Sequence, residues 1–184
     1  MKTVVLAFVF VLALPLAISA QDETNEPEGF NFIIGPRIGY SYAFMSQADF
    51  SSLVGQVFPA GSYSPATTVF GLSLEQRILL GQTRSHFAFQ EVLAIHGLEQ
   101  SIALPVLAAL IGYRDGSGIE AGIGPMLSAN GISVLAAFGY TFSFKGVYIP
   151  VDLSMTIPNS KSATLLSVTS GFNFIIEKKK GIGP

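Results

Sequence analysis

The sequence predicts an all-β fold: an eight-stranded antiparallel up-and-down transmembrane β-barrel. The stretch Ile132 to Phe144 alternates, with apolar or aromatic residues at every even position and mostly small or hydroxylated residues at odd positions. Charged residues make up 12% of the 184 residues and hydrophobic residues 49%, whereas a soluble domain carries about 25% charged residues. The most apolar internal run, Ile102 to Ile111, is about half of the ~20 residues that a spanning helix needs. High mean hydropathy without spanning helices favours a barrel with lipid outside and a crowded lumen inside.

The beginning of the chain has the pattern of a cleaved export signal. Lys2 precedes an apolar segment, Val4 to Leu16, and the sequence Ala17-Ile18-Ser19-Ala20 suits cleavage before Gln21. The domain prediction is therefore a signal peptide at 1–20, a flexible acidic leader at 21–28, the barrel at 29–177 and a polar tail at 178–184. The predicted location is the cell outer membrane.

Eight alternating or continuously apolar segments follow the leader in order. They are Phe30 to Phe44, Thr67 to Leu80, His86 to His96, Ser101 to Tyr113, Ile119 to Ser128, Ile132 to Phe144, Val147 to Ile157 and Ala163 to Ile176. Turn signals separate several of them, among them Arg114 to Gly118, Asn130-Gly131 and Lys145-Gly146. The longest connection, Met45 to Ala66, is predicted to be the first outer loop because an even strand count keeps both termini on the periplasmic side.

The same six-residue sequence occurs around the beginning of the first predicted strand and at the end of the last one. Gly29 to Ile34 reads Gly-Phe-Asn-Phe-Ile-Ile, and the same six residues recur at Gly171 to Ile176. These two strands must pair to close a barrel, so a repeated sequence in the two strands is consistent with closure. Chance or an old duplication would produce the same repeat.

Glu91 does not fit the predicted pattern of its strand. It shares a face with Phe87, Phe89, Leu93 and Ile95, which would place a carboxylate in lipid at a cost on the order of kilocalories. The sequence leaves two explanations open: a bulge at Gln90-Glu91 shifts the phase, or the register of this strand is different.

Three motifs resemble the small outer-membrane β-barrel domain family of Gram-negative envelopes. They are Ile102 to Leu107 with its Leu-Pro step, Gly112-Tyr113-Arg114, and Glu120 to Pro125 with its Gly-x-Gly-Pro pattern. The resemblance implies the barrel fold and insertion by the barrel-assembly machinery, and it implies little about function. One departure is that Phe172 and Phe174 are followed by a polar tail instead of ending the chain on an aromatic residue.

The lumen of an eight-stranded barrel is just wide enough for side chains to fill it. The residues predicted to carry inward charges are Arg37, Glu75, Arg77, Glu120 and Asp152. Two bases and three acids in a narrow space should pair with one another, which predicts a salt-bridge plug. The functional alternative is an ion or proton path, or a gate that opens when the pairs exchange.

Catalytic and metal chemistry have little support in the sequence. His86 and His96 lie at opposite ends of one strand, too far apart for a shared metal or catalytic site, and the chain has no cysteine. His96 with Glu99 and Ser101 is the sole hydrolase candidate. We therefore predict no catalytic residue, no metal and no cofactor, and the formal net charge of −2 argues against a nucleic-acid partner.

The leading functional hypothesis is a structural or surface-interaction role for a barrel with a filled lumen, with outer-membrane lipid as a partner and the surface partner unknown. The alternatives are a narrow channel or carrier for small or apolar solutes, a lipid-modifying enzyme, and a soluble periplasmic calyx like a lipocalin. The calyx requires bulky apolar side chains to point inward.

Overall fold

A computed structural model describes residues 31–79, 85–129, 131–144, 147–157 and 163–176. The predicted signal peptide, leader and polar tail lie outside these residues. The described strands are Asn31–Ala43 (β1), Ala66–Leu79 (β2), His86–His96 (β3), Leu104–Arg114 (β4), Ile119–Ser128 (β5), Gly131–Phe144 (β6), Val147–Ile157 (β7), Leu165–Gly171 (β8) and Phe174–Ile176 (β9). An α-helix, Gln47–Val54 (α2), and a 3₁₀ turn, Leu98–Gln100 (η1), complete the described elements.

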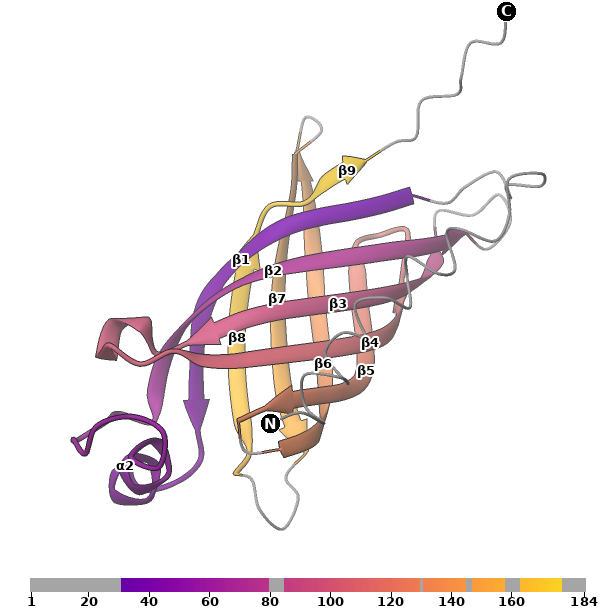
Figure 1. Cartoon of the computed structure of the whole chain (residues 1–184). Coiled ribbons are helices and arrows are strands. Elements are labelled where there is room, and N and C mark those ends of the chain that lie inside the picture. The colour runs from indigo at the N-terminus through magenta and orange to yellow at the C-terminus, as the bar shows by residue number, and fades with distance from the viewer. Residues whose placement is uncertain (1–30, 80–84, 130, 145–146, 158–162, 177–184) are drawn as a thin grey trace, which may run out of the picture.

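The strands close into a barrel (Figure 1). Each strand from β2 to β8 pairs antiparallel with its sequence neighbour, and β1 closes the sheet by pairing with β2 on one side and with β8 and β9 on the other. Ile38, for example, lies opposite Phe70 of β2 and Ser170 of β8. The strands β8 and β9 follow each other along the chain, and both pair with β1, so together they count as the eighth strand of the barrel. The prediction of eight antiparallel strands is confirmed.

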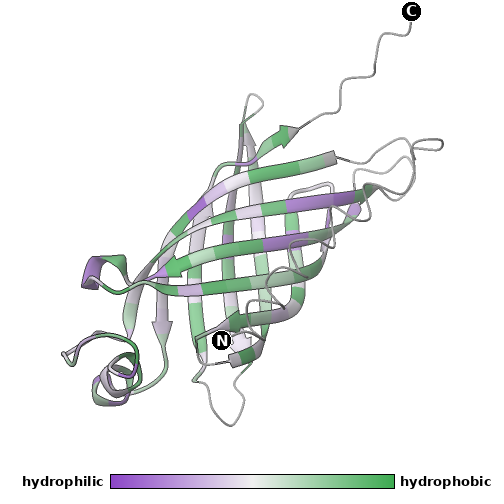
Figure 2. Ribbon diagram, viewed as in Figure 1, coloured by the Kyte–Doolittle hydropathy of each residue, from purple (hydrophilic) through white to green (hydrophobic). Residues whose placement is uncertain are grey.

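The outward face of the barrel is apolar. Bulky side chains from successive strands are exposed there, such as Phe70, Ile111, Phe138 (60% exposed) and Leu153. Small or polar residues of the same strands, such as Ser41, Ser73 and Ser167, are buried on the inward side. Green apolar bands recur along the strands in Figure 2. This arrangement suits lipid outside, and the architecture is that of a small outer-membrane β-barrel. It is the reverse of what the soluble calyx requires.

The connection Met45 to Ala66, which was predicted to be the first outer loop, contains an α-helix that its sequence did not suggest. The helix α2 begins after Ser46, whose hydroxyl oxygen accepts a hydrogen bond from the backbone N–H of Asp49 at 3.1 Å, a standard N-cap. Phe50 and Val54 of α2 are buried against Ala43 and Ile102. This contact joins the loop to the barrel rim, and it involves residues too far apart in sequence for a local pattern to reveal.

Several strand ends differ from the prediction by one or two residues, and two strands differ more. The predicted strand starting at Ser101 starts instead at Leu104, because η1 and the left-handed backbone of Ser101 (φ 58°) turn the chain first. The last predicted strand is interrupted between Gly171 and Phe174. At the interruption, the Asn173 side chain accepts a hydrogen bond from Arg37 at 2.7 Å, and its backbone N–H donates to Tyr148.

The question left open at Glu91 is answered by the pairing of β3. Glu91 lies opposite Leu74 of β2 and Ala109 of β4, and the register continues on both sides without a bulge. Both explanations offered for Glu91 are therefore wrong: the strand has no bulge and its alternation is unchanged, so Glu91 stands on the outward-facing side of β3, where it is buried. Neither of its carboxylate oxygens has a hydrogen-bond partner among the described residues.

Candidate functional site in the barrel lumen

Charged side chains from five strands meet inside the barrel, near the end opposite α2. We call these side chains the ion-pair network. Its members are Arg37 of β1, Glu75 and Arg77 of β2, Arg114 of β4, Glu120 of β5 and Asp152 of β7. All five residues predicted to carry inward charges lie in it. The network places three guanidinium groups against three carboxylates in one cross-section of the lumen.

Arg114 is the centre of the network. Its Nη2 lies 2.6 Å from Oε2 of Glu75, and its Nη1 lies 2.6 Å from Oε2 of Glu120. The register explains the second pair, because Arg114 and Glu120 lie directly opposite each other on β4 and β5. Arg114 also donates to the side-chain oxygen of Gln90 at 3.1 Å. All three ion-pair partners are almost completely buried, so solvent screens these pairs little.

Arg37 and Arg77 complete the pairing of the acids. Arg37 Nε lies 3.8 Å from Oδ2 of Asp152, and Arg77 Nε donates to Oε1 of Glu75 at 2.9 Å. Glycine at position 139 leaves room for the Asp152 carboxylate, since a Cβ there would lie 2.1 Å from Oδ1 of Asp152. The geometry therefore neutralises each acid of the network with at least one guanidinium group.

Sequence reasoning missed Arg114 and Asn173 as members of the lumen. Arg114 was assigned to a turn because Asp115-Gly116-Ser117-Gly118 follows it. The even positions of its strand, ending in Leu110 and Gly112, already face inward, so parity could have placed Arg114 in the lumen. Parity also places Asn173 inward, between the outward-facing Phe172 and Phe174, but its bond to Arg37 joins residues 136 positions apart and has no local signal.

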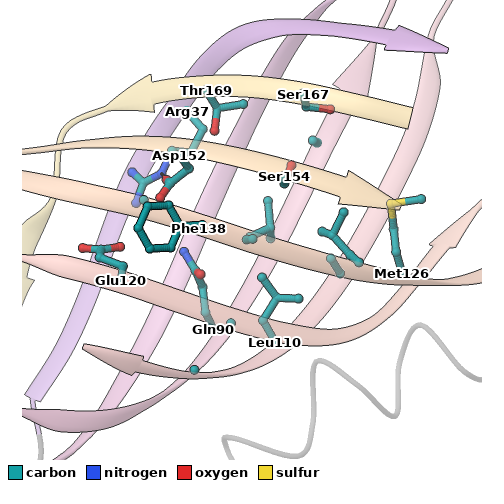
Figure 3. Close-up of a pocket in the computed structure, with 18 of the residues that line it drawn as sticks. Arg37, Gln90, Leu110, Glu120, Met126, Phe138, Asp152, Ser154, Ser167 and Thr169 are labelled. Carbon is teal, nitrogen blue, oxygen red and sulfur yellow. Dashed lines mark ion pairs between the residues drawn. The ribbon is translucent and has the colours of Figure 1, made fainter. Parts of the chain in front are cut away.

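A central cavity lies between the ion-pair network and the middle of the barrel (Figure 3). It encloses about 90 Å³ of free space. Arg37, Glu120 and Asp152 line one end of the view, and Met126 lies at the other end. Side chains such as Val92, Ala108, Leu110 and Leu135 form most of its wall.

An outer cavity, also of about 90 Å³, lies beneath α2. Phe50 and Leu53 of α2 line it, together with Met45 and Pro65 of the same loop. The barrel side of the cavity is formed by residues such as Leu104, Ser133 and Thr156. The end of the lumen next to α2 is therefore covered by the loop that contains this helix.

His96 lies where the two cavities meet. It is 7% exposed, and its Nδ1 lies 2.9 Å from Oγ of Ser41, which is hydrogen-bonded to Oγ1 of Thr67 at 2.7 Å. The structure does not assemble the hydrolase candidate of His96, Glu99 and Ser101. Glu99 instead accepts hydrogen bonds from Thr68 and Gln100, and Ser101 is exposed.

Glu99 fixes η1 to the start of β2. Desolvation opposes its ionisation, but hydrogen bonds from the Thr68 hydroxyl and the Gln100 side chain outweigh this effect and lower the pKa of Glu99. The carboxylate is thus held ionised and connects η1 to β2 through its hydrogen bonds with Thr68.

No group of three or more metal-ligating side chains suited to a metal ion occurs within the described ranges. The same residues include no helix long and apolar enough to cross a membrane.

Comparison with solved structures finds outer-membrane barrels from Yersinia pestis. The backbone structure of the outer membrane protein Ail in a phospholipid bilayer nanodisc aligns with 80% of this chain and 100% of its own, at 12% identity and a TM-score of 0.45. The crystal structure of Ail, the attachment invasion locus protein, aligns over the same shares of the two chains at 12% identity and a TM-score of 0.43. No family model and no curated protein matches the sequence.

Proposed function

We propose that this protein is a closed, non-conducting barrel that holds the α2 loop at the cell surface in a structural or surface-interaction role, without catalytic turnover. The observation that carries the proposal is the position of Arg114 between Glu75 and Glu120. These paired charges occupy the lumen at one end, and the α2 loop covers it at the other.

Ions would cross this lumen only by disrupting the network. Separating one partner of a buried ion pair leaves an uncompensated charge, at a cost of about 3–5 kcal/mol. A barrel of eight strands has no spare width through which an ion could bypass the pairs. The proposal therefore favours the salt-bridge plug over the ion path.

The outer loop is the feature that a partner outside the cell would meet. The cap at Ser46 and the buried Phe50 and Val54 give α2 a fixed position at the rim, while Val57 just after it is 70% exposed. The proposed partners also include outer-membrane lipid, against the apolar outward face, and the barrel-assembly machinery.

Planar-bilayer recording tests the closed lumen. The unmodified protein should give no steady current, because the network excludes ions. Arg114→Ala should give brief cation-selective openings, since Glu75 and Glu120 lose their shared cation and draw water and cations into the lumen.

Arg77→Ala is the matched control for this recording. Arg77 contacts the same Glu75, but its side chain is 20% exposed, and Glu75 keeps Arg114 without it. This variant should remain silent. A steady ohmic current through the unmodified protein would contradict the proposal.

A further inference from the structure

The central and outer cavities adjoin each other in the barrel, and we treat them together as one compartment. Four residues, His96, Val106, Met126 and Leu165, line both cavities. The compartment is bounded by the ion-pair network at one end and by Phe50 and Leu53 of α2 at the other. Such a preformed concave space is the usual setting for binding of a small molecule.

The wall of this compartment selects against charge. Its aliphatic side chains, such as Val92, Leu110 and Leu135, offer no partner for an ion. The charged groups at its end are already paired: Arg114 with Glu75 and Glu120, and Arg37 with Asp152. An anionic or cationic ligand would have to break one of these pairs, whereas an uncharged apolar ligand would leave them intact.

His96 supplies one polar contact in the middle of the compartment. Its Nδ1 is engaged with Ser41, and no described residue provides a hydrogen bond to its Nε2. The imidazole is buried and lines both cavities. Nε2 is a donor in one tautomer and an acceptor in the other, and a hydroxyl group can satisfy either.

We propose that this compartment is a binding site for a small uncharged apolar molecule with one hydrogen-bonding group, such as an aliphatic alcohol. The apolar body lies along the wall around Met126, and the hydroxyl group meets Nε2 of His96. This inference goes beyond the proposed function, because a non-conducting barrel needs no ligand. Entry is from the outer side, beneath α2.

Methyl NMR of the full barrel in lipid nanodiscs tests the site, with the methionine methyl groups labelled with ¹³C and hexanol as the probe. Met126 reports on the compartment, and Met155, on the outward face and 47% exposed, reports on hexanol dissolved in the lipid. Hexanol should shift the Met126 signal saturably, while the Met155 signal changes only in proportion to hexanol in the membrane. Parallel, unsaturable shifts of both signals would overturn the site.

Two variants locate the bound molecule. Ala108 lies opposite Met126 and lines the central cavity, whereas its neighbour Ala109 lies opposite Glu91 on the outward side. Ala108→Leu fills the cavity and should abolish the saturable shift, and Ala109→Leu should preserve it. Saturable binding that survives Ala108→Leu would overturn the lumen as its location; if that variant fails to fold, Ala137→Leu in the same wall provides the same test.

Two further measurements test the chemistry of the ligand. Hexanoate, the charged counterpart of hexanol, should give no saturable shift, and an equal response would overturn the selection against charge. His96→Leu should weaken hexanol binding up to about tenfold, the worth of one hydrogen bond. Unchanged affinity in this variant would overturn the contact with His96.

Discussion

At the scale of single residues, the same type of side chain has opposite effects on stability on the two faces of the barrel. Glu120 and Glu91 are both glutamates in strands, but Glu120 faces inward and pairs with Arg114, whereas Glu91 faces outward. The neutralised carboxylate is part of the lumen structure. The outward carboxylate has no hydrogen-bond partner among the described residues, and it therefore lowers the stability of the barrel.

One substitution made at both sites should give opposite results. Glu91→Leu should raise the free energy of unfolding by about 1–2 kcal/mol, because Glu91 is 4% exposed and the substitution removes a buried carboxylate that has no hydrogen-bond partner among the described residues. Glu120→Leu should lower it by about 3 kcal/mol or more, because Arg114 loses a buried partner. Urea titrations in lipid vesicles, read from the mobility of unboiled samples on gels, measure both changes. A loss of stability in Glu91→Leu would show that Glu91 has a stabilising partner.

At the scale of elements, the glycines between β4 and β5 differ in how closely the neighbouring strand approaches them. A Cβ at Gly124 would lie 1.9 Å from the carbonyl oxygen of Ala109, and backbone atoms cannot move aside without separating the strands. A Cβ at Gly122, two residues earlier on the same face, would meet its nearest atoms at 3.6 Å, an ordinary contact. The two glycines therefore have different roles.

Replacing each glycine with alanine separates these roles. Gly124→Ala should destabilise the barrel by about 3 kcal/mol or more, the upper part of the range for overpacking, and Gly122→Ala should change stability by less than about 1 kcal/mol. The fraction of heat-modifiable folded protein on unboiled gels is the measurement. Equal behaviour of the two variants would contradict the close approach of β4 to Gly124.

At the scale of the whole molecule, the strand order sets which loops lie together. The helix α2 and η1 lie at one end of the barrel, and the turn Asp115 to Gly118 lies at the other (Figure 1). With the N-terminus of the barrel on the periplasmic side, α2 faces the cell exterior.

Single cysteines test this orientation cleanly, because the chain has no cysteine of its own. Val57→Cys, in the α2 loop, should react on intact cells with a maleimide that cannot cross the outer membrane. Ser117→Cys, in the opposite turn, should react only after the cells are opened. The reverse pattern would show that α2 faces the periplasm.

The sequence by itself determined the strands, their faces and the closure of the barrel. The alternation in stretches such as Ile132 to Phe144 is a local property of the sequence. It predicts which side chains of a strand face lipid without information about any other strand. The same parity holds at Glu91, where neither the bulge nor the different register that the sequence left open occurs. Five inward charges could be identified for the same reason.

Only the tertiary structure decided how those residues meet. The pairing of Arg114 with Glu75, the bond of Arg37 to Asn173 and the contact of Phe50 with Ile102 each join distant segments. These contacts depend on strand register and on closure, which bring residues to the same height in the lumen. A sequence pattern fixes the side of the sheet to which a residue points, whereas the residue it faces across the barrel is fixed by the closed sheet as a whole.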